Sequence, residues 1–272
     1  MTDTTKESSW IQTVTVLRSL YDTLIEFEAL FFTLRFSQGM VFVTNEGSEQ
    51  APWIARIIEA QPQMVAFDCD GTLWSVDSGS GFFEWELDRG VVGPTAAATA
   101  RQQFADYLSG SVSEDAMCGY LATMHQGMPI DTVRAAAEKY VVTNVHPALF
   151  NDMVELVYQL RDIGCTVWLV SATNQWVIEA AAALIGIPAD RVLATAAAIV
   201  DGVITDRLER VPSGPGKRTA LQAAAGAVPD AAFGNSRWDV EMLAYARQAY
   251  AVHPSSELVR IASERGWPVL YP

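Results

Sequence analysis

Short apolar runs alternate with longer amphipathic segments from residue 63 to the C-terminus. Each run has the length of a strand and is apolar at nearly every position, which is typical of a parallel strand buried on both faces. Asp201-Gly202 adds a two-residue turn of the kind that closes a hairpin. This alternation predicts an α/β fold, in which an open parallel sheet carries helices on both faces. The predicted parallel strands are Met64–Phe67, Cys165–Val170, Ala231–Gly234, Ala249–Val252 and Val269–Leu270.

A long stretch of helical pattern interrupts the alternation between the first two strands. We therefore predict an α/β core formed by residues 63–76 and 161–272, with an all-helical domain inserted at 77–160. Residues 1–62 are predicted as an N-terminal helical extension.

The composition limits the kinds of partner that the chain can bind. Half of the 272 residues are apolar, so a sizeable core can form. The net charge of −14 and the isoelectric point near 4.5 disfavour nucleic acid and anionic membrane surfaces, because their phosphates would be repelled. An anionic small molecule must therefore be attracted locally, by a metal ion, a lysine or backbone amides. Homo-oligomerisation is left open by these data.

Cysteine and histidine are too scattered to suggest a disulfide framework or a zinc site. Cys69, Cys118 and Cys165 lie far apart, and we expect a reducing cytoplasm. No secretory signal is visible at Met1–Trp10. The apolar stretch Ile11–Phe36 contains five charged residues, so it predicts an amphipathic helix and no membrane span.

Two acidic residues follow the first predicted strand, in the sequence Asp68-Cys-Asp70-Gly71-Thr72. A carboxylate can attack phosphorus to form an aspartyl-phosphate, and a second one can protonate the leaving oxygen and then activate water. Mg²⁺ prefers hard oxygen ligands and accepts one or two carboxylates together with a phosphate. Gly71 allows a sharp turn, and Thr72 offers a hydroxyl and an amide. Taken alone, this segment is better explained as a strand end with a solvated Asp-Gly turn.

Further polar residues are expected near the carboxyl ends of the parallel strands, where open sheets bind ligands. Ser171 provides a hydroxyl and amides at a helix N-terminus, an arrangement that suits phosphate. Lys217 can neutralise phosphate, and Asn235 and Asp239 offer oxygens to a cation. Individually these are an N-cap serine, a solvated lysine and an ordinary cap. Together with Asp68 they predict one site.

The order of these motifs resembles that of the haloacid dehalogenase (HAD) superfamily, in its phosphatase branch. The resemblance covers Gln63 to the C-terminus and rests on four motifs. It implies a Rossmann-like core and a helical cap domain between the first two motifs, an arrangement similar to that of phosphoserine phosphatase. The four motifs are Phe67–Leu73, Ser171–Asn174, Lys217 and Gly234–Leu243.

The resemblance also implies an activity, Mg²⁺-dependent hydrolysis of a small-molecule phosphate monoester. Asp68 would be the nucleophile, and Asp70 the general acid and base. Ser171 and nearby amides would hold the phosphoryl group, while Lys217 would offset its charge. The implied substrate-binding residues are Thr72, Asp77, Ala172 and Asn174, and the implied metal ligands are Asp68, Asp70 through its backbone carbonyl, Asn235 and Asp239.

One position departs from the family pattern, because Asn235 stands where family phosphatases usually have aspartate. Its amide oxygen can still bind Mg²⁺, but one negative charge is missing. We therefore predict weaker metal affinity, with Asp239 as the main carboxylate of this motif.

The predicted cap gives partial information about the substrate. Asp77 stands at the offset of an acidic cap residue that contacts the substrate amine in phosphoserine phosphatase. No arginine follows in Cys118–Gly127 to bind a substrate carboxylate, so phosphoserine is disfavoured. Nearby aromatic side chains could hold a cationic head group, although packing at the cap hinge is the favoured interpretation. They are Trp74, Phe82, Phe83 and Trp85.

Two other functions remain open at this stage. The aspartyl-phosphate could be transferred to an alcohol in place of water, which would make the protein a phosphotransferase. Alternatively, Asn235 could have weakened the metal site and left a binding or regulatory protein with the same fold.

Overall fold

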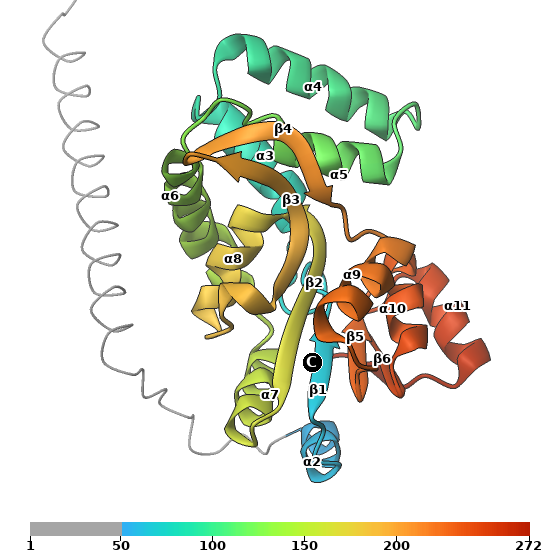
Figure 1. Cartoon of the computed structure of the whole chain (residues 1–272). Helices are drawn as coiled ribbons and strands as arrows, with labels where there is room; N and C mark the ends of the chain where they lie inside the picture. Colours follow the sequence, from blue (N-terminus) through green and yellow to red (C-terminus); the bar gives the residue numbers. More distant parts are fainter. Residues whose placement is uncertain (1–50) are drawn as a thin grey trace, which may run out of the picture. The chain divides into compact units, whose positions relative to one another are not determined.

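The computed structural model describes residues 51–272, and the predictions made for residues 1–50 lie outside this range. The described residues form a seven-stranded sheet in the order β4-β3-β2-β1-β5-β6-β7 (Figure 1). Every neighbouring pair is parallel except β3 and β4. The predicted α/β sheet is therefore confirmed. The strands are β1 Met64–Phe67, β2 Thr166–Asn174, β3 Val192–Val200, β4 Val203–Arg210, β5 Ala231–Gly234, β6 Gln248–Val252 and β7 Val269–Leu270.

Helices cover both faces of this sheet (Figure 1). Contacts join α7 and α8 to β2, while α10 contacts β5 and β6. None of the helices in residues 51–272 is long and apolar enough to cross a membrane. The helices of the core are α2 Pro52–Glu59, α7 Asn151–Asp162, α8 Gln175–Leu184, α9 Pro215–Ala225, α10 Val240–Tyr245 and α11 Ser256–Arg265.

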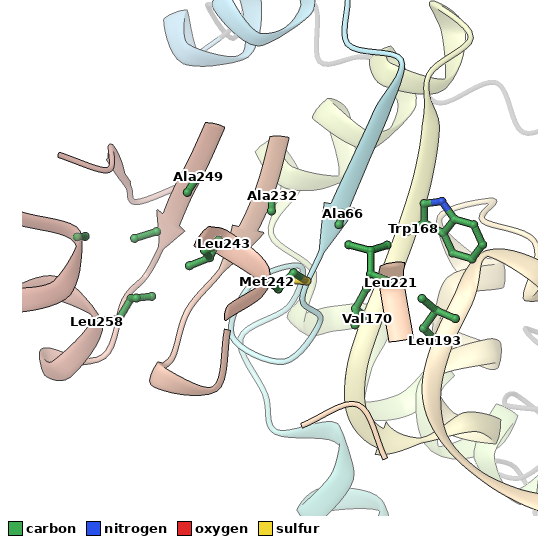
Figure 2. Close-up of a cluster of buried hydrophobic side chains, with 12 residues drawn as sticks. Ala66, Trp168, Val170, Leu193, Leu221, Ala232, Met242, Leu243, Ala249 and Leu258 are labelled. Atoms are coloured by element: carbon green, nitrogen blue, oxygen red, sulfur yellow. The ribbon is translucent and has the colours of Figure 1, made fainter. Parts of the chain in front are cut away.

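The central strands are buried because both of their faces are packed. On one face, side chains of β1, β2, β5 and β6 meet α9, α10 and α11 in a single apolar cluster (Figure 2). Alternate residues point to the other face, where Phe67 and Phe233 stack with ring centroids 4.5 Å apart. This two-sided burial explains why these strands show continuous apolar runs in the sequence.

The inserted domain is entirely helical and lies between β1 and β2 in the chain. Its helices are α3 Ser78–Asp88, α4 Pro94–Leu108, α5 Glu114–Thr123 and α6 Ile130–Tyr140. The predicted domain range continued to residue 160, but α7 contacts β2 and α2 and thus packs with the sheet. From these contacts we propose that the chain returns from the inserted domain to the core near residues 146–150.

The β3–β4 hairpin reaches from the sheet to the inserted domain. Its turn has the predicted form, with positive φ at Asp201 (51°) and Gly202 (77°). Backbone hydrogen bonds run from Gly127 N to Ile204 O (2.8 Å) and from Ile130 N to Gly202 O (2.9 Å). These hydrogen bonds join the segment between α5 and α6 to the hairpin. The inserted domain is therefore attached to the core at the hairpin as well as through its two linkers.

Candidate active site

A cavity of about 470 Å³ opens at the carboxyl ends of β1 and β2 and extends to the inserted domain. Because parallel strands end at the same edge of the sheet, the side chains that follow β1, β2 and β5 converge there. Six of the predicted site residues line the cavity on the core side, namely Asp68, Asp70, Ser171, Ala172, Lys217 and Asn235.

Asp68 follows β1 directly and is buried at 5% exposure. Its Oδ1 accepts a hydrogen bond from Lys217 Nζ (2.5 Å), and its Oδ2 accepts one from Thr72 Oγ1 (2.8 Å). Burial, followed by the charge of Asp239, raises the pKa of Asp68 to about 7, against the opposing effect of Lys217. A cation beside this carboxylate would favour its charged form.

Lys217 is held between two carboxylates. Its Nζ also donates to Asp239 Oδ1 at 2.6 Å, and only 3% of the lysine is exposed. Burial opposes the charge, but Asp239 and Asp68 outweigh it and raise the pKa of Lys217 above its usual range. The ammonium group is therefore fixed and charged at the cavity wall.

Asp239 lies behind Lys217 and does not line the cavity. Its Oδ2 accepts hydrogen bonds from Asn235 N (3.0 Å), Ser236 N (2.9 Å) and Ser236 Oγ (3.0 Å). Gly234 permits this arrangement, because a Cβ at 234 would lie 2.5 Å from the Asp239 Cβ. The contacts of Asp239 thus favour a role in orienting Lys217 over its predicted role as a metal ligand.

Asp70 is oriented by three donors from different segments. Trp74 Nε1 (2.6 Å) and Ser78 N (2.8 Å) donate to Oδ1, while Thr173 Oγ1 (2.7 Å) donates to Oδ2. Burial and then the nearby carboxylate of Asp77 raise the pKa of Asp70, against the hydrogen bonds from Ser78 and Thr173. A raised pKa suits a group that must carry a proton.

The end of β2 presents the predicted phosphate-binding groups in part. Ser171 and Ala172 line the cavity, and Ser171 Oγ accepts a hydrogen bond from Thr173 N at 3.1 Å. Asn174, predicted to bind substrate, is outside the cavity lining and caps α8 through a hydrogen bond from Val177 N to its Oδ1 (3.2 Å). Thr72 likewise contacts Asp68 and does not line the cavity.

Asn235 lies over the turn that follows Asp70. A Cβ at Gly71 would be 1.8 Å from Asn235 Nδ2, so the amide packs directly on this glycine, which has φ +75°. Asp68, Asp70 and Asn235 all line this cavity, and among their atoms are carboxylate, backbone carbonyl and amide oxygens. No group of three or more His, Cys, Asp or Glu side chains in residues 51–272 could hold a metal ion. The oxygen donors fit Mg²⁺, which takes one or two carboxylates and keeps several waters.

The inserted domain lines the other half of the cavity with apolar and acidic groups. Glu114 accepts a hydrogen bond from Tyr107 OH at 2.5 Å, and Asp77 caps α3 by accepting from Ser80 N at 2.9 Å. Lys217 is the one basic side chain among the described residues that line the cavity. The remaining lining residues of this half include Phe104, Met117, Cys118 and Leu121.

Several of these site residues were not predicted from the sequence. Thr173 stood inside a quoted motif, but nothing in the sequence indicated that it contacts Asp70. Tyr107 and Glu114 lie far from every motif, and only the packing of the inserted domain brings them to the cavity. The aromatic residues suggested as a cation site do not line it, and Trp74 and Phe82 are fully buried.

Known proteins resemble this chain in sequence and in fold. The family model for haloacid dehalogenase-like hydrolases matches residues 65–244. The "Inhibition of morphological differentiation protein" of Streptomyces azureus is 30% identical over 77% of this chain and 78% of its own. A histidinol-phosphatase of Neisseria meningitidis serogroup C is 26% identical over 76% of this chain and 97% of its own.

Solved structures give the same result for the fold. A Bordetella pertussis protein of unknown function matches with a TM-score of 0.67 and 27% identity, over 76% of this chain and 97% of that one. A phospho-aspartyl intermediate analogue of phosphoserine phosphatase matches with a TM-score of 0.50 and 17% identity over 76% of this chain and 91% of that one, which shows the fold alone. The resemblance inferred from the four motifs is therefore confirmed, and the chain belongs to the haloacid dehalogenase-like hydrolase family as a phosphatase-like enzyme.

Proposed function

We propose that the protein is a Mg²⁺-dependent phosphatase that hydrolyses a small-molecule phosphate monoester through an aspartyl-phosphate on Asp68. One observation carries this proposal. A buried carboxylate, ion-paired with Lys217 at 2.5 Å, shares a cavity with Asp70, a second carboxylate held by three hydrogen bonds. A nucleophile beside a fixed positive charge and a separate acid is the set of groups that phosphoryl transfer needs.

In the first step, a carboxylate oxygen of Asp68 forms a bond to phosphorus while the bond from phosphorus to the ester oxygen breaks. Asp70 gives its proton to that oxygen, and the alcohol leaves. In the second step, water attacks the phosphorus, Asp70 takes a proton from this water, and the bond to Asp68 breaks to release phosphate. Lys217 offsets the negative charge that builds up on the phosphoryl oxygens, with Ser171 and the amides at the end of β2 as hydrogen-bonding partners.

Mg²⁺ would be held by Asp68, the backbone carbonyl of Asp70 and the amide oxygen of Asn235. When bound, it would offset phosphate charge in a cavity that is otherwise strongly acidic. Only one of the proposed Mg²⁺ ligands is a side-chain carboxylate, that of Asp68. Asn235 is uncharged, and Asp239 forms an ion pair with Lys217. Weaker metal affinity follows from this smaller negative charge.

The substrate is proposed to be a small phosphorylated metabolite. The half of the cavity that the leaving group would occupy contains Asp77 and Glu114 and no basic side chain among its described lining residues. A leaving group with a carboxylate would lack a partner there, whereas a neutral or cationic one would not. This supports the expectation that phosphoserine is a poor substrate. Phosphotransfer to an alcohol uses the same residues, and no observation favours it. The cytoplasmic location and the absence of nucleic-acid partners stay predictions.

The test is a screen of purified protein against a panel of phosphomonoesters, with and without Mg²⁺. We expect Mg²⁺-dependent release of free phosphate in the absence of any added acceptor. Asp68→Asn should reduce this release to background while the protein stays folded. Undiminished turnover by Asp68→Asn would refute the aspartyl-phosphate mechanism, and turnover that needs an added alcohol would identify a phosphotransferase.

A further inference from the structure

The carboxylate of Asp70 is held asymmetrically. Its Oδ1 accepts from two nitrogen donors, Trp74 Nε1 at 2.6 Å and Ser78 N at 2.8 Å, while its Oδ2 accepts from the Thr173 hydroxyl at 2.7 Å. An indole or backbone N–H can donate but cannot accept, whereas a hydroxyl can turn and do either. A proton on Oδ1 would have to point at one of two fixed N–H groups. A proton on Oδ2 would meet a group that can accept it.

Trp74 cannot easily turn away from this contact. Its side chain is fully buried, and its carbonyl accepts a hydrogen bond from Gly71 N at 2.7 Å. The residue also bridges to Leu149, in the segment through which the chain returns from the inserted domain.

The two linkers of the inserted domain run side by side at this point. Ser75 N donates to Ala148 O at 2.9 Å, and Phe150 N donates to Leu73 O at 3.0 Å. The indole is thus clamped where both linkers meet, so its N–H is preorganised toward Asp70.

We infer that Trp74 is a positioning residue for Asp70, whose indole N–H fixes Oδ1 and leaves Oδ2 as the oxygen that exchanges the proton with the leaving group. This inference rests on the proposed function. Burial alone would explain Trp74 as a core residue, whereas its hydrogen bond to Asp70 gives it a role in catalysis. Asp70 keeps its role as the group that moves the proton, and Trp74 acts only through it.

Trp176 offers a matched comparison within the same chain. It is also almost fully buried, at 1% exposure, but its Nε1 finds no hydrogen-bond partner in residues 51–272. Replacing either tryptophan by phenylalanine removes the same atoms from a buried site. Only the change at position 74 removes a hydrogen bond to the proposed acid.

The experiment compares Trp74→Phe with Trp176→Phe on two phosphomonoesters. An alkyl phosphate needs a proton on its leaving oxygen, whereas p-nitrophenol leaves readily as an anion. The measured quantity is kcat/KM, which reports the step in which the leaving group departs. We expect Trp74→Phe to lower kcat/KM about tenfold or more for the alkyl phosphate and less than about threefold for p-nitrophenyl phosphate. Trp176→Phe should change kcat/KM by the same factor for both substrates.

A double-mutant cycle separates positioning from packing. In an Asp70→Asn background, Trp74→Phe should cause little further loss with the alkyl phosphate, because the group through which it acts is gone. If Trp74→Phe fails to fold, benzothienylalanine at position 74 keeps the bicyclic shape and removes only the N–H. Equal loss on both substrates, or full additivity with Asp70→Asn, would overturn the inference. The proposed function would stand in that case, since it is tested by Asp68→Asn.

Discussion

Asp68 and Asp70 are two residues apart and chemically identical, but their neighbours differ in kind. Asp68 accepts hydrogen bonds from a buried ammonium group and a hydroxyl, and the ammonium group favours the charged carboxylate that the proposed nucleophile needs. Asp70 has no positive partner within hydrogen-bonding distance among the described residues and is held by neutral donors, which suits a proton carrier. The division of labour that we propose for these two carboxylates follows from these contacts.

The substitution Gly71→Ala tests how closely the turn after Asp70 packs on Asn235. Its Cβ would lie 1.8 Å from Asn235 Nδ2, so the amide must leave its position over the turn. We expect kcat/KM to fall about tenfold or more. Backbone strain at this positive φ should also lower the free energy of unfolding by about 1–2 kcal/mol.

Gly90→Ala is the matched control for this change. Gly90 has a similar φ of +66°, but its Cβ would meet nothing within 4 Å. Gly90→Ala should therefore lower the free energy of unfolding and leave kcat/KM unchanged. Equal kcat/KM values for the two variants would show that activity does not require the Asn235 amide to pack on Gly71.

Asn235→Asp restores the charge that the family pattern would have at this position. We expect the variant to bind Mg²⁺ about tenfold more tightly, or ~1.4 kcal/mol, measured by titration calorimetry on the metal-free protein. Asn151→Asp adds the same charge at an exposed site and serves as the control. An unchanged Mg²⁺ affinity in Asn235→Asp would mean that residue 235 is not a metal ligand.

At the scale of elements, the inserted domain is fixed to the core by more than its linkers. α6 and α3 contact α8, while α5 contacts β3 and β4. Inside the domain, His125 Nε2 and Glu86 Oε2 lie 2.6 Å apart, and both side chains are buried. His125 also packs edge-on against Trp176 of α8, with ring centroids 5.4 Å apart. This pair therefore joins α3 to the α5–α6 connection at the boundary with the core.

Glu86→Gln should change how stability depends on pH. Burial raises the pKa of Glu86 above its ordinary value of 4.5, against the hydrogen bond with His125, so the folded protein keeps this proton to higher pH than the unfolded chain does. The stability from this proton is fully present below pH 4.5 and is lost as the pH rises through the folded-state pKa. We expect Glu86→Gln to destabilise the protein by about 1–3 kcal/mol at pH near 5, and by less at pH near 8.

Denaturant unfolding at several pH values measures this difference. Glu84→Gln lies on the same helix but at an exposed position, and it should have almost no effect at any pH. A destabilisation by Glu86→Gln that is the same at all pH values would contradict the argument.

At the scale of the whole molecule, the cavity exists only where the inserted domain meets the sheet. The core lines the cavity with the groups that we propose to react, and α4 and α5 line the part in which we place the leaving group. The proposed mechanism thus assigns chemistry and selectivity to separate parts of the chain.

This division predicts discrimination against a substrate carboxylate. O-phosphoethanolamine and O-phosphoserine share an amine and differ by one carboxylate, which would face Glu114 and Asp77 without a basic partner. We expect kcat/KM to be about tenfold or more lower for phosphoserine. Glu114→Gln should narrow the gap, whereas Asp115→Asn, on the exposed side of α5, should not. Equal turnover of both compounds by the unmodified protein would rule out this account of selectivity.

The sequence by itself determined the α/β sheet with its inserted helical domain and the family, and it singled out the core residues that we propose to react. These follow from local pattern, because a buried parallel strand is apolar throughout and each motif lies at the end of such a strand or at the start of a helix. Only the tertiary structure decided that Asp239 supports Lys217, that Asn174 caps a helix, that Trp74 and Thr173 hold Asp70, and that Tyr107 and Glu114 reach the cavity. Several of these contacts join residues far apart in the chain, such as Thr173 with Asp70 and Lys217 with Asp239, so they depend on how the elements pack together. The Asn174 cap and the hydrogen bond from Trp74 to Asp70 are local, but the sequence does not specify which partner these polar atoms take.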